Sequence, residues 1–147
     1  MGWGGAFALV FGEYVQNDSL PNVSRILTFK LGGKAKLPEV SWQRPRPFVK
    51  DSTSANKETL TEGYRLYQEL CMGCHGLNAV SGRLIPDLRR SPMISNQSAF
   101  AAVVLKGALS TRGMPNFQPY LDQRQAEAVR AYLIQQAERG RKLQAAE

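Results

Sequence analysis

The fold is decided by one short stretch of the sequence, Cys71-Met72-Gly73-Cys74-His75. At the end of a helix, residues three positions apart are neighbours on one face, so the thiols of Cys71 and Cys74 point the same way. His75 follows the second cysteine directly and is the only histidine of the chain. The stretch therefore predicts a site that presents two thiols and one imidazole from a single turn.

The C-x-x-C-H spacing is the attachment motif of a c-type haem. Two thiols on one side of a turn can add to the two vinyl groups of one porphyrin, and the next residue then reaches the iron. We therefore predict that Cys71 and Cys74 bind haem covalently and that His75 is an axial iron ligand. Because the chain has no second histidine, an iron site with two histidines from this chain is excluded.

Three other uses of the two cysteines compete with haem attachment. A thioredoxin-type dithiol needs a βαβ pattern around the motif, and the sequence shows none. A zinc site needs a second Cys/His pair, whereas the chain has only two cysteines and one histidine. A chance match with one disulfide between Cys71 and Cys74 is the remaining alternative.

The second axial ligand has to come from one of the four methionines. Met72 points away from the iron because of its place inside the motif. Met114 lies in a Gly- and Pro-bounded loop, residues 112–117, and a thioether on a stiff loop makes a persistent ligand. We predict Met114 as this ligand. Met93, at the head of a predicted helix, is the alternative, and any methionine can simply fill a core.

The loop Ile85-Pro86-Asp87-Leu88 is expected to support the histidine. A ligating histidine usually donates its other ring N–H to a carbonyl or carboxylate, and this rigid loop can present the Pro86 carbonyl. The alternative is that Pro86 only shapes a turn. Basic residues flank these loops and are expected to form a solvated rim: Arg83, Arg89, Arg90, Lys106 and Arg112. The alternative is that some of them neutralise haem propionates or dock a partner.

Composition narrows the class of protein. With 43% apolar residues the chain is not a disordered tail. No apolar run reaches about 18 residues, so no transmembrane segment is predicted. The net charge is +7, but no five like charges follow one another, which argues against a nucleic-acid partner. A mildly basic surface can still steer an acidic protein partner.

Apolar periodicity predicts two helices on either side of these loops. The first runs through residue 70, with Thr59 or Asn56 as its N-cap. One face of this helix carries Leu60, Tyr64 and Tyr67. The second helix is expected over residues 95–106, with Gly107 as its stop. Its apolar stripe is formed by Phe100, Val103 and Val104.

A third helix is predicted from the N-cap Asp122 to about residue 139, with Gly140 ending it. Its apolar face is formed by Ala126, Val129, Tyr132 and Leu133. Aromatic residues of the first helix are expected to contact Tyr132, and Gly63 would let the two helices approach closely. Three helices with long loops bury too little apolar surface alone, so we expect an all-α domain built around a haem.

The residues before this domain differ in character. Residues 1–37 are predicted to form a short β-like extension, with a strand over 22–31 that Gly32-Gly33 ends. Residues 38–57 read as a Pro-rich linker, and the haem domain spans 58–147. The opening residues are glycine-broken and begin without a basic residue, so they predict no export signal.

Residues 58–140 resemble a class I cytochrome c: a helix into the haem motif, a loop proline, a methionine loop and a C-terminal helix. Finer motifs are similar to the cytochrome domain of quinohaemoprotein alcohol dehydrogenases, namely Cys74-His75-Gly76, Ile85-Pro86-Asp87-Leu88-Arg89 and Gly113-Met114-Pro115-Asn116-Phe117. Gly2-Trp3-Gly4-Gly5-Ala6 and residues 25–38 are similar to the last strands of the quinone-binding propeller in that family. The resemblance implies a class I cytochrome c-like helical fold preceded by a β-like extension and linker.

The resemblance also implies a function. In that family a propeller oxidises an alcohol with pyrroloquinoline quinone (PQQ) and calcium, in the periplasm. Electrons then pass singly to a haem, held here by Cys71 and Cys74 and ligated by His75 and Met114, and on to a small redox protein or a membrane acceptor. Most of the propeller is missing from this chain, so PQQ and calcium are expected in a missing or separate part.

The chain is therefore predicted to carry electrons one at a time, without a complete catalytic site of its own. One alternative is that the chain is a fragment or subunit of the PQQ-dependent alcohol dehydrogenase and is known by that activity. A third possibility is a haem-based gas sensor, which needs a labile sixth position on the iron.

Overall fold

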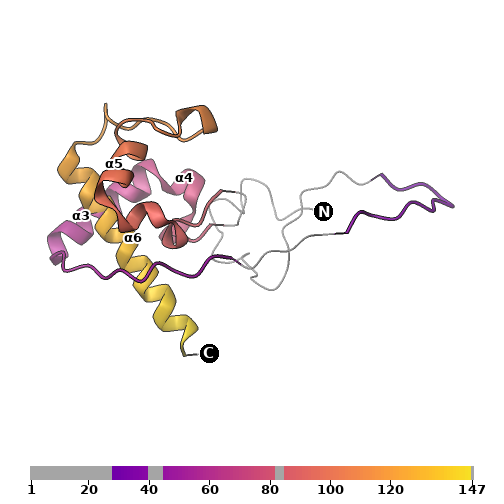
Figure 1. Ribbon diagram of the computed structural model, residues 1–147, viewed down its shortest axis with the longest axis horizontal. Helices are drawn as coiled ribbons and strands as arrows, with labels where there is room; N and C mark the ends of the chain where they lie inside the picture. Colours follow the sequence, from indigo (N-terminus) through magenta and orange to yellow (C-terminus); the bar gives the residue numbers. More distant parts are fainter. Residues whose placement is uncertain (1–27, 40–44, 82–84, 147) are drawn as a thin grey trace.

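A computed structural model describes residues 28–39, 45–81 and 85–146 (Figure 1). Its α-helices are α3 (Lys57–Leu70), α4 (Met72–His75), α5 (Gln97–Val104) and α6 (Gln123–Gln144). Short 3-10 helices lie between them: η1 (Leu77–Ala79), η2 (Leu88–Arg90), η3 (Pro92–Ser95) and η4 (Ser110–Arg112). No strand occurs in these three ranges, and the predicted all-α fold is confirmed.

Helix α3 begins where a polar side chain caps its first turn. The Asn56 side chain accepts a hydrogen bond from the Thr59 N–H at 2.9 Å, so Asn56 is the N-cap and Thr59 is inside the helix. The buried face of α3 is formed by Gly63, Leu66 and Tyr67. This face differs from the predicted apolar face of the helix, since Tyr64, which was part of the prediction, is 47% exposed.

Helix α6 begins as predicted and ends later. Asp122 caps it in a reciprocal box, in which the Asp122 carboxylate accepts from the Gln125 N–H and the Gln125 side chain accepts from the Asp122 N–H. The prediction that Gly140 ends the helix is wrong, because α6 continues to Gln144. Gly140 is buried, and a Cβ added there would lie 2.8 Å from the Phe48 ring. The glycine therefore makes room for an aromatic ring.

Helices α3 and α6 cross in close contact (Figure 1). A Cβ added to Gly63 would lie 2.1 Å from the Ala128 carbonyl oxygen, so only glycine lets the backbones come this near. The Tyr132 ring meets Tyr64 at 5.6 Å and Tyr67 at 5.3 Å between centroids. The expected glycine-mediated approach and the expected tyrosine contact are both present.

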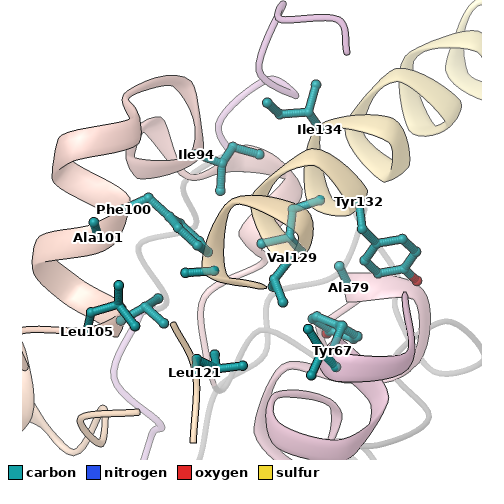
Figure 2. Packing of buried hydrophobic residues seen from close by; sticks show 14 of the residues in the cluster. Tyr67, Ala79, Ile94, Phe100, Ala101, Leu105, Leu121, Val129, Tyr132 and Ile134 are labelled. Atoms are coloured by element: carbon teal, nitrogen blue, oxygen red, sulfur yellow. The ribbon is translucent and has the colours of Figure 1, made fainter. Parts of the chain in front are cut away.

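The hydrophobic core gathers around α6 (Figure 2). The predicted apolar face of this helix is buried throughout: Ala126, Val129, Tyr132 and Leu133. Helix α5 covers it with Phe100, Ala101 and Val104. Helix α5 is shorter than predicted because Asn96 caps it, accepting from the Ala99 N–H at 2.8 Å. These contacts fix the helices from which the connecting loops extend.

The N-terminal extension is described only over residues 28–39, and every one of these residues is exposed. They contain a turn in which Gly32 has φ +74° and the Gly33 N–H donates to the Lys30 carbonyl at 3.0 Å. The last four residues of the predicted strand, 28–31, are therefore irregular. The rest of that strand, and the other motifs that resemble propeller strands, lie outside the described residues.

Residues 45–56, here called the strap, have no regular secondary structure but lie against the helical body (Figure 1). The Val49 N–H donates to the Arg89 carbonyl at 3.0 Å. The Arg141 guanidinium of α6 donates to the Val49 carbonyl, and also to the Asp51 carbonyl at 3.0 Å. The strap therefore contacts both α6 and η2, while the division of the chain at residue 57 stays a prediction.

Candidate functional site

The cysteine–histidine motif forms one tight helical turn. Cys71 ends α3, and its carbonyl accepts from the Cys74 N–H at 3.2 Å and the His75 N–H at 2.9 Å. Cys71 is half-buried and Cys74 is exposed. After the turn the chain leaves through Gly76, whose φ of +80° suits glycine. The two thiols and the imidazole thus belong to residues of a single turn.

A buried tyrosine fixes the end of this turn. The Tyr67 hydroxyl donates to the Gly76 carbonyl at 2.7 Å, and Tyr67 is fully buried. Burial strongly raises the pKa of Tyr67, with further contributions from Cys71 and Tyr132, so its hydroxyl stays a donor at physiological pH. The motif is therefore tied to the α3–α6 crossing through one side chain.

The imidazole of His75 is held in one tautomer. His75 is buried, and its Nδ1 lies 3.1 Å from the Pro86 carbonyl oxygen. Because a carbonyl oxygen only accepts, Nδ1 carries the proton and Nε2 is left with its lone pair. Burial lowers the pKa of His75, against the opposing effects of the Pro86 carbonyl and the Asp87 charge. A neutral imidazole with Nε2 unprotonated is the form that ligates iron.

The two thiols have different surroundings. Burial raises the pKa of the Cys71 thiol to about 12, and the charge of Cys74 adds to the effect. Cys71 also packs against the hydrophobic cluster, together with its neighbour Met72. At neutral pH the thiol is therefore the resting form of the Cys71 side chain.

The predicted methionine ligand lies in a loop between α5 and α6. Gly113 has a φ of +89°, which permits the turn that precedes Met114. Met114 is partly buried against the same hydrophobic cluster as Cys71. Met93, the alternative, lies in η3 and is 39% exposed. Met114 thus shares a packing environment with the haem motif.

The loop that carries Pro86 is held by two arginines. The Asp87 carboxylate accepts from the Arg89 guanidinium at 2.6 Å and pairs with the Arg90 guanidinium at 3.5 Å. The side chains of Asp87, Arg89 and Arg90 are 8%, 11% and 9% exposed. The prediction of a solvated rim is therefore wrong for Arg89 and Arg90. Lys106 and Arg112 are exposed as expected, and Arg83 lies outside the described residues.

Sequence reasoning did not find the aromatic partner of these arginines. The Arg90 guanidinium lies 3.7 Å from the centroid of the Phe48 ring, and that of Arg89 lies 4.9 Å away. The Asp-x-Arg-Arg spacing was a local signal for the ion pairs. Nothing local links Phe48 to residues some forty positions later.

Other site types receive no support from the part of the chain that is described. Within residues 28–39, 45–81 and 85–146, no group of three or more His, Cys, Asp or Glu side chains could hold a metal ion. Within the same ranges, no helix has both the length and the apolar character needed to cross a bilayer.

The residues present fit a c-type haem. The motif offers two thiols on one turn. The neighbouring imidazole is buried, its Nδ1 lies 3.1 Å from the Pro86 carbonyl oxygen, and burial lowers its pKa, which favours the neutral form with Nε2 unprotonated. The roles of Cys71, Cys74, His75, Met114 and Pro86 toward that haem stay predictions.

Known proteins resemble this chain over most of its length. It is 38% identical over 137 residues to quinohemoprotein alcohol dehydrogenase ADH IIB of Pseudomonas putida, covering 90% of this chain and 19% of that protein. It is 37% identical to the dehydrogenase subunit of an alcohol dehydrogenase (quinone) from Acetobacter aceti, covering 93% of this chain and 18% of the relative. The chain thus spans less than a fifth of these curated relatives.

A solved structure shows the same fold. The quinohemoprotein alcohol dehydrogenase ADHIIG of Pseudomonas putida HK5 matches with a TM-score of 0.80 and 32% identity, covering 96% of this chain and 20% of that chain. The predicted resemblance to the cytochrome region of such enzymes is confirmed.

A family model identifies the helical part. The model described as "Cytochrome C oxidase, cbb3-type, subunit III" matches residues 58–133, which is more than half of the chain. This match carries the haem motif, α3, α5 and the first half of α6. It supports the predictions of a c-type haem and of electron transfer as the role of this region. The chain therefore belongs to this family of cytochrome c domains, whose model is described by subunit III of the cbb3-type oxidase.

Proposed function

We propose that this chain relays single electrons from a quinone-dependent alcohol dehydrogenase site to an external acceptor. The observation that carries the proposal is the buried His75 in a C-x-x-C-H turn, with its Nδ1 at hydrogen-bond distance from the Pro86 carbonyl oxygen. This arrangement serves an axial ligand, because it leaves Nε2 free for a metal and fixes the plane of the ring.

Each predicted site residue has a distinct task. Cys71 and Cys74 would hold the porphyrin through thioether bonds, while His75 and Met114 would ligate the iron. When bound, the haem supplies a one-electron couple between Fe(III) and Fe(II). A thioether opposite an imidazole favours Fe(II) and raises the reduction potential. The hydrophobic cluster beside Cys71 and Met114 limits the access of water.

The electron donor is proposed from the relatives. The two relatives align with 90% and 93% of this chain, which is more than the part matched by the family model, residues 58–133. The similarity therefore extends into the N-terminal residues. Both relatives are named as quinone-dependent or quinohemoprotein alcohol dehydrogenases. A propeller domain or subunit that binds PQQ and calcium is therefore the proposed donor.

The acceptor and the compartment are proposed on chemical grounds. A small redox protein or a membrane-bound acceptor would take the electron, and the net charge of +7 favours an acidic partner. Haem is normally attached covalently outside the cytoplasm, so the proposed compartment is the periplasm of a bacterium.

The proposal is tested with the matured haem protein. The ferric protein is mixed with a PQQ-loaded alcohol dehydrogenase and its alcohol, and the haem absorption is followed in time. Reduction is expected only when both enzyme and alcohol are present. The chain alone, supplied with PQQ, calcium and alcohol, is expected to reduce no phenazine methosulfate.

Two results would overturn the proposal. One is matured protein without a Soret band, because the relay requires the haem. The other is ready binding of carbon monoxide to the reduced protein at neutral pH, because a labile sixth position indicates a gas sensor and contradicts ligation by Met114.

A further inference from the structure

The strap inserts one aromatic side chain into the helical body. Phe48 is 8% exposed, and its ring fills the space that a side chain at position 140 would occupy. The guanidinium groups of Arg90 and Arg89 lie 3.7 Å and 4.9 Å from the ring centroid. A desolvated guanidinium over an aromatic face is an attractive contact. The ring is therefore enclosed between α6 and the end of η2.

Hydrogen bonds to main-chain groups of the strap fix it on both sides of this ring. Before it, the Arg46 carbonyl accepts from the Arg90 guanidinium at 2.6 Å. After it, the Val49 N–H donates to the Arg89 carbonyl at 3.0 Å. The strap and η2 thus contact each other through the Phe48 ring and through hydrogen bonds that flank it.

The same two arginines hold the loop that carries Pro86. Asp87 follows Pro86 directly, and its carboxylate pairs with Arg89 at 2.6 Å and Arg90 at 3.5 Å. The preceding carbonyl, that of Pro86, lies 3.1 Å from Nδ1 of His75. A chain of contacts therefore leads from the Phe48 ring to the two guanidinium groups, to Asp87, and through the adjoining Pro86 carbonyl to the imidazole.

We propose that Phe48 is a positioning residue for the haem ligand. By stacking on Arg89 and Arg90 it holds residues 85–90 in place, keeps the Pro86 carbonyl at hydrogen-bond distance from His75, and so helps to set the reduction potential. This inference rests on the proposed ligation of iron by His75, and it adds a residue outside the haem loops to the control of the potential.

The direction of the effect follows from ligand chemistry. An imidazole that donates its Nδ1–H to a carbonyl is a more basic ligand, and a more basic ligand favours Fe(III) over Fe(II). Loosening that bond is therefore expected to raise the reduction potential. Replacing Phe48 neither adds nor removes a charge near the proposed haem ligand.

The experiment uses two variants that approach the contact from opposite sides. Phe48→Leu keeps an apolar side chain but removes the aromatic face. Arg90→Lys keeps the positive charge but removes the planar guanidinium group that stacks on the Phe48 ring. Spectroelectrochemical titration of the matured haem protein is expected to show a higher midpoint potential in both variants. Proton NMR of the reduced protein is expected to show faster exchange of the His75 Nδ1–H.

Two control variants separate positioning from general loosening. Arg141→Lys loosens the same strap at the Val49 and Asp51 carbonyls, keeps the charge, and changes neither the Phe48 ring nor the two guanidinium groups beside it. Ile134→Val removes one methylene from the buried face of α6. Both are expected to lower the melting temperature without changing the potential or the Nδ1–H exchange.

The outcomes distinguish this inference from the proposed function. An unchanged potential and unchanged exchange in Phe48→Leu and Arg90→Lys would overturn the inference alone, with the haem spectrum intact. Equal shifts in Arg141→Lys or Ile134→Val would also overturn it, because general loosening would then explain them. A parent protein that lacks covalent haem would overturn the proposed function itself.

Discussion

The α3–α6 crossing and the loops that carry the predicted haem ligands are held together in different ways. At the crossing, backbones meet directly: a Cβ on Gly63 would lie 2.1 Å from the Ala128 carbonyl, and tyrosine rings close the gap. The loops consist of short 3-10 turns, and Asp87 and Arg90 fix the turn at η2 through ion pairs and hydrogen bonds.

The difference separates stability from chemistry. Substitutions at the crossing act on packed backbone, so they are expected to change the free energy of unfolding and leave the haem spectrum alone. Substitutions in the loops act on ligands and on the groups that orient them, so they are expected to change the spectrum or the potential first.

The largest effect is expected from removing both thiols. In Cys71→Ala with Cys74→Ala no thioether can form, so acidic organic solvent is expected to extract all of the haem. The single variant Cys71→Ala keeps one thioether and serves as the control, with haem that stays bound to the polypeptide. Absorption spectra of the extracted protein measure the result, and covalent haem in the double variant would contradict the assignment.

The predicted methionine ligand is tested next. Met114→Ala is expected to remove the weak near-infrared charge-transfer band of Met–Fe(III) ligation and to lower the reduction potential. Met93→Ala is the matched control, because Met93 is 39% exposed and lies outside the cluster that Met114 contacts. If the band survives in Met114→Ala and disappears in Met93→Ala, the ligand is Met93.

The contrast predicts the opposite behaviour for the crossing. Gly63→Ala places a methyl group 2.1 Å from a backbone oxygen, which cannot move aside as a side chain tip does. We expect a loss of about 3 kcal/mol in the free energy of unfolding, with an unchanged haem spectrum in the folded protein. Urea unfolding of the parent and the variant measures the loss.

These contrasts also explain what could be predicted from the sequence. The C-x-x-C-H turn, the Asp122 cap and the buried face of α6 depend on residues close together in the chain, so their spacing predicts them. The Pro86 carbonyl was expected near His75, and the two atoms lie 3.1 Å apart. The motif and its neighbouring loops carry their information locally.

Contacts between distant parts of the chain could not be predicted in the same way. Gly140 has the signature of a helix stop, yet it lies inside α6 because the Phe48 ring occupies the space beside it. Arg89 and Arg90 have the signature of a solvated rim, yet that ring and Asp87 cover them. The strap contributes to both errors, because its position depends on tertiary packing rather than on local periodicity.

One side chain joins the two regions, and its hydroxyl is expected to have an intermediate effect. Tyr67→Phe removes the 2.7 Å hydrogen bond to the Gly76 carbonyl and leaves a buried acceptor unsatisfied. The expected cost is about 1–2 kcal/mol. Tyr120→Phe is the control, because Tyr120 is 69% exposed. Equal melting temperatures for the two variants would show that the hydroxyl does not tie the motif to the crossing.

The smallest effect is expected at the exposed edge of the crossing, where Arg124 donates to both carboxylate oxygens of Glu62, at 2.9 Å to Oε1. The hydrogen bond from Arg124 lowers the pKa of Glu62 below its usual 4.5, with opposing and smaller effects from burial. A carboxylate with a lowered pKa stabilises the fold above its unfolded pKa, and this stabilisation is lost as the pH falls through the folded value. Glu62→Gln is therefore expected to lower the melting temperature slightly at pH 7 and to have no effect at a pH below both values. Because the pair is exposed, high salt is expected to remove the difference at pH 7 as well. A difference that persisted in acid or in high salt would mean that Glu62 contributes by packing at the crossing and not by its charge.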